Sequence, residues 1–104
     1  MQFHHLGVPV TEPKDNETHL EDVGVYITDS DSNPYKIEWL RFEANSPMPK
    51  EIQENVHAAF TVDNLEEALA GQEVILDPVS PMEGLRIAFV LHEGTPVELM
   101  EFSQ

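Results

Sequence analysis

One phrase occurs twice in this chain. Residues 35–43 read YKIEWLRFE and residues 95–102 read TPVELMEF, so Glu38 and Glu98 stand in matching places, each flanked by apolar residues. Both phrases alternate with the period of a β-strand. Because the same strand pattern occurs once in each half of a chain of only 104 residues, we predict an internal duplication.

A second matching pair lies upstream of the first. Residues 5–10 read HLGVPV and residues 57–62 read HAAFTV, and the two align without a gap, histidine on histidine. Strand alternation places His5 on one face with Phe3, Gly7 and Pro9, and places His4 on the other face with Leu6, Val8 and Val10. His5 and His57 are therefore predicted to be equivalent.

The second half of the chain predicts a strand, a helix and three further strands. Asp63 with Glu66 can form a capping box, and Gly71 suits the C-terminal end of the helix. The predicted elements are a strand over 55–62, a helix over 63–71, and strands over 73–76, 84–91 and 96–102, separated by the turn-rich DPVSPMEG and by HEGT.

The first half is a shorter version of the same unit. Strands are predicted over 3–10, 20–28 and 35–43, but the stretch after Val10 contains Pro13 and no apolar periodicity, so the helix is missing or reduced to a loop. His5 and Glu38 are 33 positions apart whereas His57 and Glu98 are 41 apart, and the difference of 8 is about one short helix. We predict a single α+β domain of paired βαβββ modules, over about 1–45 and 56–104 with a connection over 46–55, forming a curved mixed sheet with a reduced first module.

Composition narrows the function. The chain has 20 acidic and 5 basic residues, a formal net charge of −15, which makes nucleic acid and membrane surfaces poor partners. It has no cysteine and no apolar run near the length of a membrane span, so we expect a soluble, cytoplasmic protein. Any metal site must use His, Asp or Glu.

The repeated glutamates face inward in this arrangement. Alternation turns each one away from its immediate apolar neighbours and toward a largely apolar face, shared with Leu40 and Phe42 or with Met100 and Phe102. A carboxylate on such a face is costly unless it is paired or bound to a metal. Two carboxylates in equivalent places, facing two equivalent histidines, predict a cation site.

These segments resemble the vicinal oxygen chelate superfamily, which includes glyoxalase I, extradiol dioxygenases, methylmalonyl-CoA epimerase and the fosfomycin and bleomycin resistance proteins. The resemblance rests on HHLGVPV, VHAAFTVDNLEEAL, GLRIAFV and TPVELMEF, and covers nearly the whole chain. It implies paired βαβββ modules around a divalent metal, with ligands from the first and last strand of each module. Carried over by position, the ligands are His5, Glu38, His57 and Glu98.

Two histidines with two glutamates are most similar to the ligand set of glyoxalase I. The implied cofactor is a divalent transition metal, Zn, Ni, Co, Mn or Fe, and the implied chemistry is that of a lyase or isomerase acting through a metal-stabilised enolate or enediolate. Glu98 and Glu38 are the candidate catalytic bases. The substrate is a small molecule with two oxygens that can chelate the metal, and its binding residues are unknown.

Two other interpretations stay open. One is a non-catalytic binding protein of the bleomycin-resistance type, and the other is a structural or regulatory domain whose metal site is a relic or a stabilising feature. We also expect a homodimer, because the reduced first half leaves an exposed sheet edge. His4, His19 and His92 are predicted to be ordinary surface or core residues. Strand parity predicts that Arg41 lies outside the cavity around the metal site. The missing helix of the first module is predicted to shorten one wall of that cavity.

Overall fold

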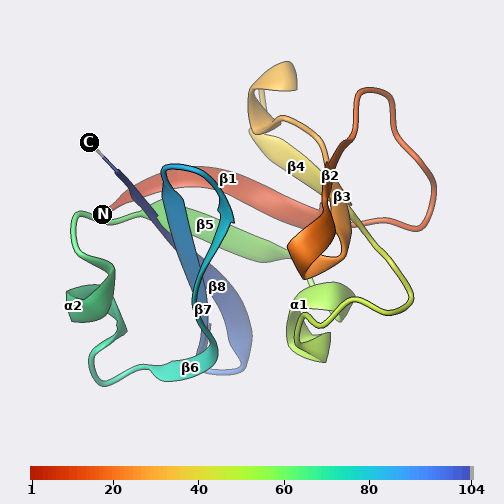
Figure 1. Cartoon of the computed structure of the whole chain (residues 1–104). Coiled ribbons are helices and arrows are strands. Elements are labelled where there is room, and N and C mark those ends of the chain that lie inside the picture. The colour runs from red at the N-terminus through yellow and green to blue at the C-terminus, as the bar shows by residue number, and fades with distance from the viewer. Residues whose placement is uncertain (104) are drawn as a thin grey trace.

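A single mixed sheet of eight strands forms the framework of the computed structural model, which describes residues 1–103. The spatial order is β2-β3-β4-β1-β5-β8-β7-β6, and Figure 1 shows how the sheet curls, with β1 and β5 at its middle. The strands are β1 (Gln2–Pro9), β2 (Thr18–Leu20), β3 (Val25–Ile27), β4 (Ile37–Phe42), β5 (His57–Thr61), β6 (Glu73–Met82), β7 (Leu85–His92) and β8 (Thr95–Phe102). The predicted α+β fold with a curved mixed sheet is confirmed.

The pairing pattern repeats in the two halves. In each half the first strand lies parallel to the last, β1 with β4 and β5 with β8, and the other two strands extend the sheet outward in antiparallel pairs. The antiparallel pair β1–β5 joins the halves at the centre. Four strands that begin or end a module therefore lie side by side in the middle of the sheet.

The first module is reduced, as predicted, because residues 10–17 form neither helix nor strand. The predicted strand over 20–28 is wrong in one respect: it is interrupted by the 3-10 turn η1 (Glu21–Val23), so that β2 and β3 form a hairpin. Gly24 ends this turn with φ +64°, and a Cβ there would lie 2.8 Å from the Ser46 Cα. A glycine is needed at that position for both reasons.

The helix of the second module is α2 (Leu65–Leu69). Its N-cap is Asn64, whose side chain accepts a hydrogen bond from the Glu67 N–H, so the predicted capping box of Asp63 with Glu66 is wrong. Gly71 follows the helix with φ +76°, which is the left-handed conformation expected beyond a C-terminus.

Two segments depart from the sequence prediction. The turn-rich stretch after Leu76 belongs to β6, which runs to Met82 at the sheet edge with several register shifts against β7. Its prolines are tolerated because an edge strand has backbone N–H groups that need no partner in the sheet. The connection between the modules contains a short helix, α1 (Lys50–Glu54), that buries Ile52 completely.

The two faces of the sheet have separate apolar cores. The inner core, under the concave face, contains Leu40, Ile52, Phe89 and Met100 among others. The outer core joins α2 to the opposite face of β7 and β8 through Leu65, Val90 and Leu99. Because α2 lies on the outer face, the prediction that a missing helix would shorten a cavity wall in the first module is wrong.

No helix among residues 1–103 is long and apolar enough to cross a membrane.

Candidate metal centre

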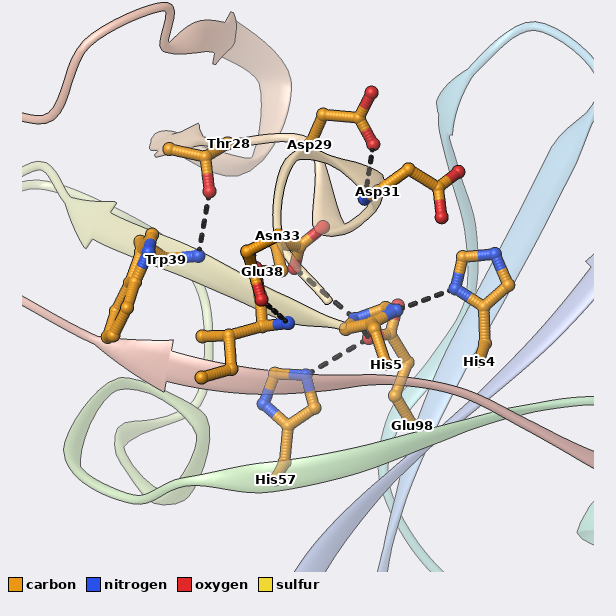
Figure 2. A network of polar contacts seen from close by, with 11 residues as sticks. His4, His5, Thr28, Asp29, Asp31, Asn33, Glu38, Trp39, His57 and Glu98 are labelled. Carbon is orange, nitrogen blue, oxygen red and sulfur yellow. Dashed lines mark hydrogen bonds and ion pairs between the residues drawn. The ribbon is translucent and has the colours of Figure 1, made fainter. Parts of the chain in front are cut away.

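Four side chains from the four central strands converge on one point of the inner face. His5 lies on β1, Glu38 on β4, His57 on β5 and Glu98 on β8. One nitrogen or oxygen atom from each lies within 4.8 Å of the others, which is close enough for all four to bind a single ion. Figure 2 shows the four side chains pointing toward one another. One chain supplies all four candidate ligands predicted from the sequence.

Strand register brings these residues together. In the parallel pair of the first module Glu38 lies beside Gly7, two positions beyond His5, and in the second module Glu98 lies beside Ala59, two positions beyond His57. The repeated spacing confirms that the glutamates occupy equivalent places. Residues two apart on a strand share a face, so each glutamate lies on the face of its histidine.

Direct contacts within the quartet are uneven. His57 Nε2 lies 3.1 Å from Glu98 Oε1, and His5 Nε2 lies 3.4 Å from one oxygen of each glutamate. Both histidines are 1% exposed and Glu98 is 6% exposed, whereas the side chain of Glu38 retains 16% of its surface. Glu98 therefore joins both histidines in the interior, and Glu38 contacts one of them from the more open side.

The charges of the quartet compensate one another. Burial alone would lower the pKa of His5, but the carboxylates of Glu38 and Glu98 raise it to about 9. Burial would likewise raise the pKa of Glu98, but its contacts with His5 and then His57 lower it. These contacts therefore favour a protonated His5 beside the Glu98 carboxylate.

The residues present fit a divalent transition metal. Two imidazoles and two carboxylates are ligands that Zn, Ni, Co, Mn and Fe(II) accept, whereas Ca²⁺ prefers oxygen ligands alone. Among the described residues, His5 Nε2 is a buried polar atom without a hydrogen-bond partner, and it faces both carboxylates. Buried polar groups without partners are uncommon in folded proteins, and a bound ion would account for this one.

A β-bulge brings a further histidine to the centre. Phe3 pairs with Phe60 and His5 with Ala59, so His4 is an extra residue on β1, and its Nδ1 lies 2.8 Å from the His5 Nδ1. Figure 2 shows the contact. Regular alternation had placed His4 on the opposite face and Phe3 beside His5; the bulge reverses both predictions, since Phe3 packs edge-to-face on Phe60 of the outer core.

This contact fixes the orientation of the His5 ring. Burial and the neighbouring His5 lower the pKa of His4, which favours a neutral His4 ring that can accept a hydrogen bond. The His5 Nδ1–H can donate to His4 Nδ1, so the proton that a metal would displace is the one on Nε2, which faces the two glutamates. Ligand histidines in metal sites generally have a partner of this kind on the nitrogen that does not bind the metal. The adjacent letters HH were the only sequence signal for it.

The ring of His57 is held by packing. A Cβ on Gly7 would lie 2.2 Å from the His57 Cε1, so the ring occupies the space that glycine leaves open. Phe89 contacts the other side of the ring in an edge-to-face arrangement, with centroids 4.9 Å apart. The Nδ1 of His57 is buried without a hydrogen-bond partner among residues 1–103.

The remaining histidines and arginines considered above lie elsewhere. His19 pairs with Glu43 and stacks on Tyr26, and His92 is exposed beside Glu93. Arg41 forms two hydrogen bonds to Glu17 on the outer face, as its strand parity predicted. None of these residues belongs to the quartet.

Comparisons with known proteins support the fold. No protein-family model and no curated protein matches the sequence. Among solved structures, a hypothetical protein from Bacillus halodurans C-125 is 26% identical, with a TM-score of 0.73 over 99% of this chain and 95% of that one. Methylmalonyl-CoA epimerase from Mycobacterium tuberculosis is 16% identical, with a TM-score of 0.68 over 99% and 89%.

The chain thus shares its fold with this epimerase, and membership of the vicinal oxygen chelate superfamily stays a prediction from the sequence. The greater likeness to glyoxalase I rests on the ligand set alone and stays a prediction.

Proposed function

We propose that this protein is a metal-dependent isomerase or lyase of the glyoxalase-like type, acting on a small substrate that chelates the metal through two adjacent oxygens. The observation that carries the proposal is the convergence of two buried histidines and two carboxylates within 4.8 Å on the inner face of the sheet. A fold shared with an epimerase supports the isomerase class.

The ligands in this proposal are His5, Glu38, His57 and Glu98. A divalent metal held by them would supply Lewis-acid polarisation of a substrate carbonyl, which acidifies the neighbouring C–H bond. Four protein ligands leave room in an octahedral site for two substrate oxygens, which matches a chelating substrate.

The two glutamates have different roles in the proposed reaction. Glu98 contacts both histidines and is nearly buried, so it acts as a fixed ligand. Glu38 has one histidine contact and lines the two hollows that reach the centre, so it is the better placed base for removing a substrate proton. Glu98 is the alternative base.

Cytoplasmic localisation and a homodimer remain part of the proposal. Since one chain supplies the whole quartet, a dimer is not needed to complete the centre, and its role would be to cover a sheet edge. Light scattering over a range of concentrations tests this point, and a monomer throughout would contradict it.

Metal analysis of the untagged protein tests the metal site. We expect near-stoichiometric transition metal in the native chain and its loss in His57→Ala and in Glu98→Gln. His19→Ala is the matched control, because it removes an exposed histidine outside the quartet and should retain the metal. Failure to take up Zn, Ni, Co, Mn or Fe(II) would overturn the proposed function.

Turnover of α-keto and α-hydroxy compounds tests the enzyme class. We expect activity only in the metal-loaded protein, and loss of activity in Glu38→Gln beyond what its metal content explains. A small molecule that binds equally well with and without metal, and is not converted, would instead indicate a binding protein of the bleomycin-resistance type.

A further inference from the structure

A cavity of about 390 Å³ opens onto the metal centre beside Glu38 and His5. Its lining combines a polar set, Asn16, Thr18, Thr28, Asp29 and Ser30, here called the polar wall, with apolar side chains such as Ile27, Leu85 and Met100. His5, whose Nε2 is buried without a hydrogen-bond partner among the described residues, is one of the residues that line it. The cavity is therefore the route by which a substrate would approach a metal held by the quartet.

The metal centre itself offers no net attraction for an anion. Two ionised glutamates and two neutral imidazoles around a divalent cation sum to zero charge. Among the described residues that line the cavity, the remaining acidic one is Asp29, which is exposed. The whole chain adds a net charge of −15, which repels anions at long range.

All five basic side chains of the chain lie within residues 1–103, and none of them is among the residues that line this cavity, although Lys14 lines a neighbouring hollow with Asn16, Thr28 and Asp29. Arg41 pairs with Glu17, Arg86 with Glu66 and Glu101, and Lys36 with Asp31. Lys14 lies over the Trp39 ring, and Lys50 is exposed at the start of α1. Three of these five charges are already neutralised by acidic partners.

The polar wall can instead form neutral hydrogen bonds. The Thr28 hydroxyl accepts the Trp39 N–H at 3.0 Å, which leaves its own O–H to donate to a ligand, and Figure 2 shows Thr28 above the quartet. Thr18 lies exposed on β2 in the same wall, and Asn16 precedes it. Hydroxyl and amide groups of this kind suit the oxygens and nitrogens of an uncharged polar molecule.

We infer that the cavity selects an uncharged or cationic chelating substrate and discriminates against anionic ones such as carboxylates and phosphate esters. This inference rests on the proposed function, because it assigns a substrate class to the same centre.

Three hydroxamates with one chelating head and different tails test the inference. Butyrohydroxamic acid has a neutral tail, β-alanine hydroxamate a cationic tail and succinic monohydroxamate an anionic tail of similar length. Their dissociation constants for the metal-loaded protein would be measured by calorimetry at low ionic strength. We expect the anionic compound to bind about tenfold more weakly than the neutral one, because its carboxylate is repelled by the negative charge of the protein. The difference between the two dissociation constants should shrink at high salt.

A charge added to the cavity wall should reverse this preference. Thr18→Lys introduces a cation at an exposed lining position and should strengthen binding of the anionic hydroxamate about tenfold, while weakening that of the cationic one. Thr11→Lys is the matched control, since it makes the same change at an exposed threonine outside the lining and should have a much smaller effect.

The outcomes separate this inference from the proposed function. If the neutral hydroxamate binds only to the metal-loaded protein but the anionic one binds as well or better, the metal centre stands and the inference is overturned. A Thr18→Lys variant that binds the three compounds as the native protein does would also overturn it. Absence of metal-dependent binding by all three would count against the proposed function itself.

Discussion

The two modules supply the same pair of candidate ligands but hold them by different means. In both, a histidine on the first strand and a glutamate on the last strand are placed by the same register. His5 is oriented by a hydrogen bond to His4 on a β-bulge, whereas the residue equivalent to His4 in the second module is Val56, which is exposed. His57 is held by Gly7 and Phe89 instead.

This difference indicates which structural features both halves of a duplicated site must retain and which can differ. Strand register determines whether four ligands meet, so it is shared by the two halves. The support behind each ligand can be built from any residue that fixes the ring, so one half uses a hydrogen bond and the other uses packing. The outer face of the sheet also differs between the modules, since within residues 1–103 it is covered by a helix, α2, in the second module and not in the first.

The largest expected effect separates the two glutamates. Loss of a residue that hydrogen-bonds to a metal ligand typically lowers metal affinity roughly 10- to 100-fold. Glu98→Gln should lower it by more than that, because Glu98 is itself a candidate ligand and contacts both histidines. Glu38→Gln should cost less, since Glu38 contacts one histidine. Competition with a metal indicator measures both affinities, and equal losses would remove the distinction between the modules.

Gly7→Ala should disturb His57 specifically. The new methyl group would overlap the His57 ring, and overpacking of this kind costs about 1–3 kcal/mol in the free energy of unfolding, with reduced metal affinity. Ala59→Gly changes the equivalent position of the second module and should retain the metal site. Thermal unfolding and metal titration of both variants provide the measurement, and an unaffected Gly7→Ala protein would show that the ring has another resting place.

Removal of His4 should weaken the site from the other module. His4→Phe keeps an aromatic ring but removes the hydrogen-bond acceptor, and we expect metal affinity to fall about 10- to 100-fold. His4→Asn can place an amide oxygen near the position of Nδ1 and should recover much of that loss. Val56→Phe alters the equivalent place in the second module and should leave the affinity unchanged. Equal affinities for His4→Phe and His4→Asn would mean that His4 fills space only.

The smallest expected effect is the release of a proton from His5 when metal binds. The pKa of His5 is raised from 6.5 to about 9 in the metal-free protein, so near pH 7 a metal must displace about one proton to bind. Calorimetry in two buffers of different ionisation enthalpy measures the number of protons released. Apparent affinity should rise with pH up to about 9, and release of no proton would contradict a protonated His5.

The stability of the metal-free protein should fall with rising pH, whereas its apparent metal affinity should rise. Because the folded-state pKa of His5 is raised, its ion pairs stabilise the metal-free protein fully below pH 6.5 and progressively less as the pH rises through about 9. Glu98 has a lowered pKa, so its contribution is present at neutral pH and is lost only in strong acid. Chemical unfolding of the metal-free protein at pH 6 and pH 9.5 should therefore show lower stability at the higher pH, and no difference would contradict this.

The sequence predicted the four candidate ligands because their signal is local and repeated. Each module has one histidine and one glutamate in a strand pattern, and the match between two copies identified all four residues before any contact was known. The loop in place of the first helix was readable for a similar reason, since residues 11–19 lack any apolar period.

Other features left no periodic signal. A bulge adds one residue without changing composition, so alternation placed His4 and Phe3 on the wrong faces. The helix α1 has five residues, too few to display a helical period, and it is stabilised by burial of Ile52 rather than by intrinsic propensity. The prolines of β6 read as turns because sequence patterns do not indicate which strand forms the sheet edge.

By itself, the sequence determined the duplication, the fold class and the four residues of the candidate metal centre, because strand period and repeated spacing are properties of the chain alone. Tertiary structure decided which histidine supports His5, why position 7 must be glycine, and where a cavity opens beside the candidate ligands. Those features depend on contacts between β1 and the strands on either side of it, and the order of residues along a single chain does not specify such contacts.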